Sequence, residues 1–219
     1  LTPLDDLPLP AWDLFFKVGP PKFGLLGGGH TMLPIAASRG CPYSCFNYCV
    51  YPLQQGRKVR VRDPKKIVEE MEHWSEKLGI TFFIFRDPVF SINREHTLEF
   101  CEALEKSSQK FKFVIETHLN NMDKELATRL RKLGLEMVKV GVESISPETI
   151  KKSNRFAIAR DEQVERIAML EKLGIKITCF YILGMPGDTA ESFRATMKYA
   201  CKLNTIFAQI SVFTPYPGT

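Results

Sequence analysis

From residue 34 onward, short runs of apolar or β-branched residues alternate with longer amphipathic stretches. The runs have the length and composition of strands, and the stretches between them repeat apolar residues at helical spacing. This alternation is typical of successive βα units that build a parallel sheet. Strands are expected at residues 34–38, 80–86, 111–117, 137–143, 176–183 and 208–213, and helices at 64–78, 94–107, 124–133, 161–173 and 190–202.

Residues at the helix ends support these boundaries. Three segments end in Lys-Leu-Gly, at residues 77–79, 132–134 and 172–174. Each glycine can adopt the left-handed conformation that closes a helix, and each lysine lies at the negative end of the helix dipole. Asp63 and Pro64 give the first long helix an N-cap and a proline in its first turn. Six units of this kind predict an α/β fold, an open, partial (β/α)6 TIM-like barrel of parallel strands.

Proline and glycine are frequent in residues 1–33, which are expected to form an extended lead-in to a barrel domain at residues 34–219. Glycines 27–29 and His30 lack the lysine and hydroxyl residue of a phosphate-binding loop, and this segment is expected to be a flexible turn.

Composition limits the function classes further. A chain of 219 residues with 44% hydrophobic content can bury one substantial core. The net charge of +5 is spread along the chain, which weakly favours an anionic substrate and does not form the clustered footprint expected of a nucleic-acid partner. No apolar run approaches the roughly 18 residues of a membrane span. Cys101, Cys179 and Cys201 are scattered, as expected of reduced core thiols in a cytoplasmic protein.

The other three cysteines, Cys41, Cys45 and Cys49, lie in one short segment. A structural zinc site normally has four ligands, typically in paired Cys-x-x-Cys units, and neither a second pair nor a histidine lies nearby in the sequence. Soft thiolates suit iron-sulfur clusters. Three of them therefore favour a cluster with one iron left free to bind something else.

This segment, Ser-Arg-Gly-Cys-Pro-Tyr-Ser-Cys-Phe-Asn-Tyr-Cys-Val-Tyr-Pro at residues 38–52, resembles the radical S-adenosylmethionine (radical SAM) enzymes, whose usual motif is C-x-x-x-C-x-aromatic-C. Its flanks resemble the branch that often carries an upstream cobalamin-binding domain, and residues 7–13 resemble the linker that follows that domain. Because the sequence starts inside this linker and ends at residues 217–219, we expect it to be a piece of a longer protein. Tyr48 keeps the aromatic residue before the last cysteine, but three residues separate Cys45 from Cys49 where the family normally has two. The resemblance implies a six-unit barrel whose Cys41, Cys45 and Cys49 hold a [4Fe-4S] cluster that binds S-adenosylmethionine.

The resemblance also implies an activity. One electron from a reductant protein would cleave S-adenosylmethionine to a 5'-deoxyadenosyl radical, which abstracts hydrogen from a small-molecule substrate. In the cobalamin-associated branch the outcome is methyl transfer or a rearrangement, and a domain outside this chain would bind the cobalamin. Two alternatives stay open: a methylthiotransferase-like enzyme acting on RNA or protein, and a non-catalytic metal-binding barrel, which the extra residue in the cysteine segment favours.

Active sites of parallel barrels lie at the carboxyl ends of the strands, so polar residues there are candidates. Asp87 follows the second expected strand and is either a turn residue or a contact to the cofactor's amino group. Glu116 ends the third strand as a functional or an ordinary surface carboxylate. Glu143 and Ser144 end the fourth strand in a run that resembles a recurrent family segment. Glu143 can accept hydrogen bonds from both hydroxyls of a ribose.

Three further residues complete the expected cofactor contacts. Arg155 is either a partner for the methionine carboxylate or a solvated surface arginine. Gly184 lies in a stretch that resembles the family's adenine-binding stretch, where glycine lets the backbone approach a flat ring, and the alternative is a simple turn. Tyr48 is expected near the adenine. His118 is expected to have no special role, and no catalytic residue is assigned.

Overall fold

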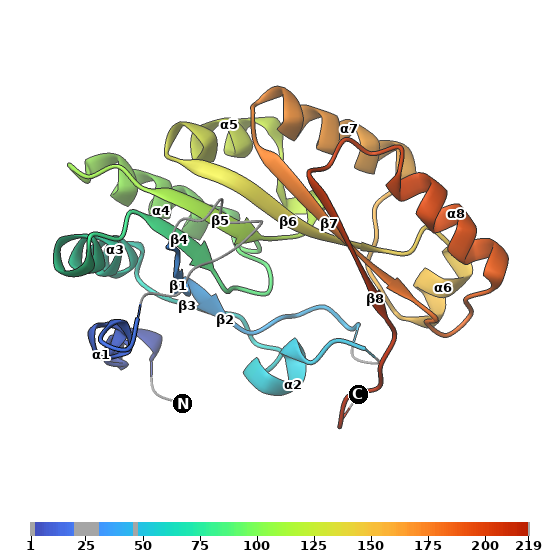
Figure 1. The fold of residues 1–219 in the computed structure, drawn as a ribbon, viewed down its shortest axis with the longest axis horizontal. Helices are drawn as coiled ribbons and strands as arrows, with labels where there is room; N and C mark the ends of the chain where they lie inside the picture. Colours follow the sequence, from blue (N-terminus) through green and yellow to red (C-terminus); the bar gives the residue numbers. More distant parts are fainter. Residues whose placement is uncertain (1–2, 20–30, 46–47, 219) are drawn as a thin grey trace.

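Six parallel strands form the main sheet of the computed structural model, which describes residues 3–19, 31–45 and 48–218. Their order is β1-β4-β5-β6-β7-β8, with bounds Leu33–Ile35, Phe82–Phe85, Lys112–Glu116, Leu135–Glu143, Lys176–Leu183 and Phe207–Val212. Between them run α3 (Pro64–Leu78), α4 (Arg94–Lys106), α5 (Lys124–Lys132), α7 (Arg160–Lys172) and α8 (Ala190–Ala200) (Figure 1). The predicted α/β architecture is confirmed, and because β1 and β8 are opposite edges of the sheet, the barrel is open.

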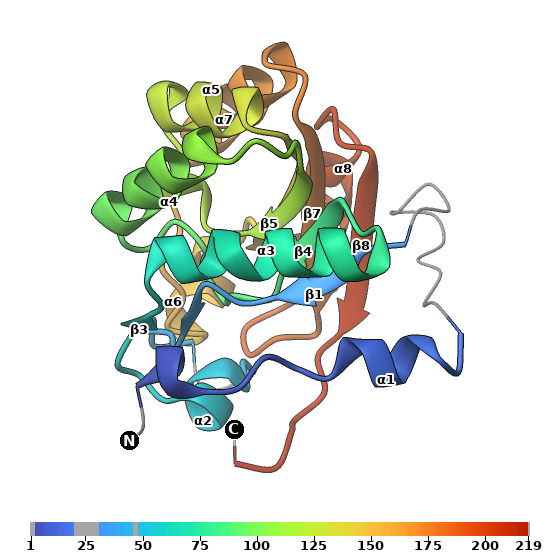
Figure 2. The ribbon, with the colours of Figure 1, turned by 90° about the vertical axis from the view of Figure 1, so that its left-hand side faces the viewer.

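The first expected strand divides into two. β1 ends at Ile35, and the chain then turns so that β2 (Ser38–Arg39) pairs antiparallel with β3 (Arg60–Val61). The cysteine segment and α2 (Tyr51–Gln55) lie between these two short strands. In Figures 1 and 2, α2 lies on the opposite side of the main sheet from α4, α5 and α7.

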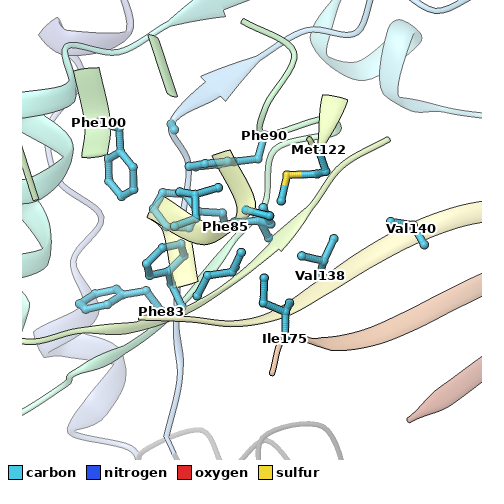
Figure 3. Close-up of a cluster of buried hydrophobic side chains, with 14 of the residues drawn as sticks. Phe83, Phe85, Phe90, Phe100, Met122, Val138, Val140 and Ile175 are labelled. Carbon is cyan, nitrogen blue, oxygen red and sulfur yellow. The ribbon is translucent and has the colours of Figure 1, made fainter. Parts of the chain in front are cut away.

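The main core lies between the sheet and its helices. Phe85 packs edge to face against Phe100 and Phe113, with ring centroids 5.5 and 5.9 Å apart, a geometry that aromatic quadrupoles favour (Figure 3). Alternate strand residues point to the other face, where Ile84 and Val114 belong to a second, smaller apolar cluster. The buried phenylalanines of β4, β5 and α4 therefore belong to the core.

The lead-in contains helical turns instead of a uniformly extended chain. Residues Leu4–Asp6 form a 3-10 turn, η1, and α1 spans Trp12–Phe16. Leu4 is buried, and the carboxylate of Asp5 accepts the backbone N–H of Asp63, the residue that caps α3. The lead-in is thereby attached to the barrel. The expected turn at glycines 27–29 and His30 lies outside the described residues.

The three scattered cysteines differ in environment. Cys101 and Cys179 are fully buried core thiols, but Cys201 is exposed, so the prediction was wrong for Cys201. It follows α8 directly, on the solvent side of the last helical turn. Within the part of the chain that the structure describes, no helix is both long and apolar enough to cross a membrane.

Candidate active site

The chain entering the cysteine segment is tied to the strand beside it. Asp87 follows β4, and its carboxylate accepts hydrogen bonds from the Ser38 hydroxyl at 2.6 Å and the Ala37 backbone N–H at 3.1 Å. Its exposed fraction is 0%, and burial raises the pKa of Asp87 to about 6 despite these two hydrogen bonds. Asp87 does not line the cavity that contains the cysteines. The geometry therefore favours a structural role for Asp87.

Cys41, Cys45 and Cys49 line one cavity of about 170 Å³ at the carboxyl ends of β5 and β6. Cys41 and Cys45 are buried, and Cys49 is half-buried. A hydrogen bond with the Cys49 side chain lowers the pKa of Cys45 to about 6, whereas burial raises the pKa of Cys41. In residues 3–19, 31–45 and 48–218, no three His, Cys, Asp or Glu side chains are close enough to hold one metal ion. All three thiols line the same cavity, and soft thiolates are the ligands that iron-sulfur clusters prefer.

A buried ion pair lies in the same cavity. Glu143 ends β6, and its Oε1 is 3.8 Å from Nη1 of Arg155. Glu143 has a φ of 65°, a left-handed conformation that is uncommon outside glycine and often marks functional sites. Its Oε2 and the Nε of Arg155 are buried without a hydrogen-bond partner in the described structure. Because each such atom costs roughly 1–3 kcal/mol, the pair fits a ligand that supplies a donor to Glu143 and an acceptor to Arg155.

Arg155 also connects the cysteine segment to β6. Its Nη1 donates to the Tyr48 hydroxyl at 3.2 Å, and its Nη2 donates to the Gly141 carbonyl. A Cβ atom at position 141 would lie 2.3 Å from Oε1 of Glu143 and 3.0 Å from Nη2 of Arg155, so a larger residue than Gly141 would require these side chains to shift. Burial raises the pKa of Glu143 to about 7, although the charge of Arg155 opposes this shift.

A second cavity, of about 270 Å³, adjoins the first and shares Tyr48, Glu143 and Phe180 with it. It extends along β7 and β8, where most of its walls are aromatic or neutral polar, as at Phe213 and Gln209. Two other cavities, of about 380 and 240 Å³, lie between α3 and α4 and beside the lead-in. Neither is lined by a cysteine, so the thiols that line a cavity identify the site better than the cavity's volume does.

The remaining predicted residues lie in different places. Glu116 lines the cysteine cavity, and burial raises its pKa. Ser144 is buried, and its Oγ accepts the backbone N–H of Ser146 within a turn. Gly184 is exposed, and its N–H donates to the Asp188 carboxylate at 2.9 Å. The structure thus brings together Cys41, Cys45, Cys49, Tyr48, Glu116, Glu143 and Arg155, while Asp87, Ser144 and Gly184 line neither of the two joined cavities.

Sequence reasoning missed an aromatic group at the edge of this cavity. The Tyr43 ring stacks on Phe156, with centroids 5.8 Å apart and an interplanar angle of 4°. His118 lies against both rings, with its Nδ1 accepting the Asn120 N–H and its Nε2 3.1 Å from the Phe156 carbonyl. This assigns the proton of neutral His118 to Nε2, which donates to that carbonyl. Its place just after Glu116 at a strand end was a sequence signal, whereas Phe156 had none.

The environment of His118 predicts a pH effect on stability. Burial lowers its pKa from 6.5 to about 4, so the folded state favours the neutral ring. Neutral His118 therefore contributes roughly 3 kcal/mol to the free energy of unfolding. This contribution is complete above pH 6.5 and is lost as the pH falls towards 4. Between pH 7 and 4.5, thermal unfolding should show a larger loss of stability for the wild type than for His118→Gln. Parallel losses would show that His118 is not held neutral, because the acid groups that titrate in this range are common to both proteins.

Comparisons with known proteins agree with this arrangement. A family model described as the radical SAM superfamily matches residues 35–200. An uncharacterized methyltransferase of Pyrococcus horikoshii is 26% identical over 220 residues, which cover 99% of this chain and 46% of the relative. The anaerobic magnesium-protoporphyrin IX monomethyl ester cyclase of Cereibacter sphaeroides is 32% identical over 186 residues, which cover 83% of this chain and 30% of the relative.

Among solved structures, the radical S-adenosylmethionine methyltransferase TsrM of Kitasatospora setae, with cobalamin and a [4Fe-4S] cluster bound, superposes with a TM-score of 0.74. The identity is 22%, and the match covers 83% of this chain and 34% of that protein, so this likeness shows the fold. The chain spans less than half the length of each of these three proteins.

Proposed function

Because the chain belongs to the radical SAM superfamily, we propose that Cys41, Cys45 and Cys49 hold a [4Fe-4S] cluster and that the two joined cavities bind S-adenosylmethionine. The observation that carries this proposal is the meeting of three thiols with the buried Glu143–Arg155 pair around one cavity. Three cysteine ligands leave one iron available to a further ligand.

The lining of the two cavities suggests which part of S-adenosylmethionine each of them binds. Arg155, in the cysteine cavity, has a free donor for the methionine carboxylate, and guanidinium groups bind carboxylates well. Glu143 lines both cavities, as expected of an acceptor for the ribose between the methionine and the base. The aromatic walls of the second cavity, including Tyr48 and Phe180, suit the adenine.

The chain's own residues would bind and orient S-adenosylmethionine and exclude water from the site. When bound, the cluster supplies the electron that breaks a carbon–sulfur bond of S-adenosylmethionine. The positive charge of Arg155 and hydroxyl donors from a ribose would favour the ionised form of Glu143, which burial alone disfavours. The apolar cluster of Ile84, Val114 and Met137 lies on the same face of the sheet as Glu116, and it keeps water out of the interior beneath the site.

The wider activity follows from the relatives. Two of the proteins compared are named as methyltransferases, which favours an enzyme of this kind over the methylthiotransferase-like and non-catalytic alternatives. The third is named as the cyclase of a porphyrin ester, which favours a small-molecule substrate. We therefore propose a cobalamin-associated methyl transfer or rearrangement, with cobalamin bound by a domain outside this chain. A one-electron reductant protein would reduce the cluster, and the cytoplasm would keep its thiols reduced. The substrate is a small molecule, and a nucleic-acid partner is not expected.

Anaerobic reconstitution of the full-length protein tests the proposal. With iron and sulfide it should form a cluster whose reduced electron paramagnetic resonance spectrum changes when S-adenosylmethionine is added. A strong reductant should then release 5'-deoxyadenosine, and a sample without reductant is the control. Tight binding of one zinc ion, with no cluster and no 5'-deoxyadenosine, would refute the proposal.

A further inference from the structure

Three consecutive residues contact three different points of the cysteine segment. The Asn154 side chain donates to the Ser44 carbonyl at 3.2 Å. Arg155 donates to the Tyr48 hydroxyl, and the Phe156 ring stacks on Tyr43. We call residues 154–156 the clasp. Its contacts reach residues on both sides of Cys45, one of the three predicted cluster ligands.

The clasp is itself held at both ends. It follows α6 (Pro147–Lys152), and the backbone N–H groups of Asn154 and Arg155 donate to the Lys151 and Ile150 carbonyls of that helix. Asn154 has a φ of 48°, a left-handed conformation that asparagine tolerates better than most residues. At the other end, Nε2 of His118 donates to the Phe156 carbonyl. A segment fixed in this way can determine the position of what it contacts.

The cysteine segment has a reason to need such support. Three residues separate Cys45 from Cys49, one more than the motif it resembles, and a longer connection has more conformations to lose on ordering. The Cys49 N–H donates to the Cys45 carbonyl at 3.0 Å, which brings the ends of this connection together. Just before this connection, Ser44 is bound from two directions, by Asn154 at its carbonyl and by Arg57 at its hydroxyl. Within it, the Tyr48 hydroxyl is bound by Arg155.

We propose that Asn154, Phe156 and His118 are positioning residues that hold residues 41–45 in the shape in which Cys41 and Cys45 are buried around the cavity. That these thiols then receive a cluster rests on the proposed function. The positions of the thiols do not depend on it, so the inference can be tested in the protein without iron.

The experiment measures alkylation of individual cysteines by iodoacetamide in the cluster-free, full-length protein, resolved by mass spectrometry. Phe156→Ala should raise the alkylation rates of Cys41 and Cys45 about tenfold, since one aromatic stack is lost and local opening becomes more frequent. Asn154→Gly, which keeps the left-handed backbone and removes the amide, should raise them by a smaller factor. His118→Gln, which can still donate to the Phe156 carbonyl, should disturb them less than His118→Ala.

Phe15→Ala is the matched control. Phe15 and Phe156 have similar exposed fractions, 52% and 48%, but Phe15 belongs to α1 and lies outside the clasp. The clasp variants should also retain less iron after reconstitution than this control does. The inference fails if Cys41 and Cys45 are alkylated in Phe156→Ala and Asn154→Gly no faster than in the wild type or in Phe15→Ala. Faster alkylation in a protein whose wild type forms no cluster would support the clasp and refute the proposed function, so the two failures are distinguishable.

Discussion

A Cys45→Ala variant is expected to form no [4Fe-4S] cluster and to release 5'-deoxyadenosine only at background level, while it remains folded. Cys45 is a buried thiol, but it faces the cavity and is not part of the main core cluster between sheet and helices. Removing one sulfur atom there should lower the melting temperature by no more than about 2–4 °C, the shift that corresponds to about 1 kcal/mol in a chain of this size. Iron and sulfide content, product analysis and calorimetry of the cluster-free protein measure the three quantities.

Cys201→Ala is the control for this variant, since Cys201 is exposed and lies outside both cavities. It should keep its cluster and its activity. Unfolding of Cys45→Ala under conditions in which Cys201→Ala stays native would indicate a structural metal site and would contradict the assignment of Cys45 to a cluster that supports chemistry.

A Gly141→Ala variant is expected to bind S-adenosylmethionine about tenfold more weakly than the wild type. The new methyl group would lie 2.3 Å from Oε1 of Glu143, so the carboxylate and Arg155 must both move. Overpacking of this kind typically costs about 1–3 kcal/mol, and here it falls on the pair proposed to hold the ribose and the methionine carboxylate. Isothermal titration of the cluster-loaded protein measures the affinity.

Gly184→Ala provides the comparison. A Cβ atom at Gly184 would meet nothing within 4 Å, but its φ of 78° makes alanine strained there. This variant should lose some stability and keep its affinity for S-adenosylmethionine. If Gly184→Ala weakened binding and Gly141→Ala did not, the adenine contact expected from the sequence would be right and the assignment of Glu143 and Arg155 would be wrong.

The six strands of the main sheet and the helices α3, α4, α5, α7 and α8 were predictable because each has its own signal, either a short apolar run or a helical repeat with capping residues. The short elements α1, α2, α6 and β3 have no such signal and were not predicted. β6 and β7 illustrate this, since their apolar runs coincide closely with the expected residues 137–143 and 176–183. The division between β1 and β2 was not predictable. It depends on Asp87, which lies about 50 residues further along the chain and takes the hydrogen bonds of Ala37 and Ser38.

The candidate site was predictable where residue type and position agreed. Thiols and a carboxylate at strand ends indicated Cys41 and Glu143, and an arginine in the connection after the fourth strand indicated Arg155. Ser144 and Gly184 carried the same positional signal, yet they make local turn contacts, because small polar residues and glycine serve turns as readily as ligands.

Asn154 and Phe156 could not be found from the sequence. They lie in a loop without periodicity. Their proposed role depends on contacts with Ser44 and Tyr43, which lie more than 100 positions earlier in the chain.

The hydrogen bond from Ser38 to Asp87 makes the geometry of the cysteine segment dependent on the correct pairing of β4 with β1. Successive residues of a strand face opposite sides of the sheet, so a one-residue slip of β4 against β1 would turn Asp87 away from Ala37 and Ser38. The entry to the cysteine segment would then lose both of its buried hydrogen bonds. A misregistered chain would consequently be a poor acceptor of iron and sulfide, and cofactor loading would discriminate between correctly and incorrectly folded molecules.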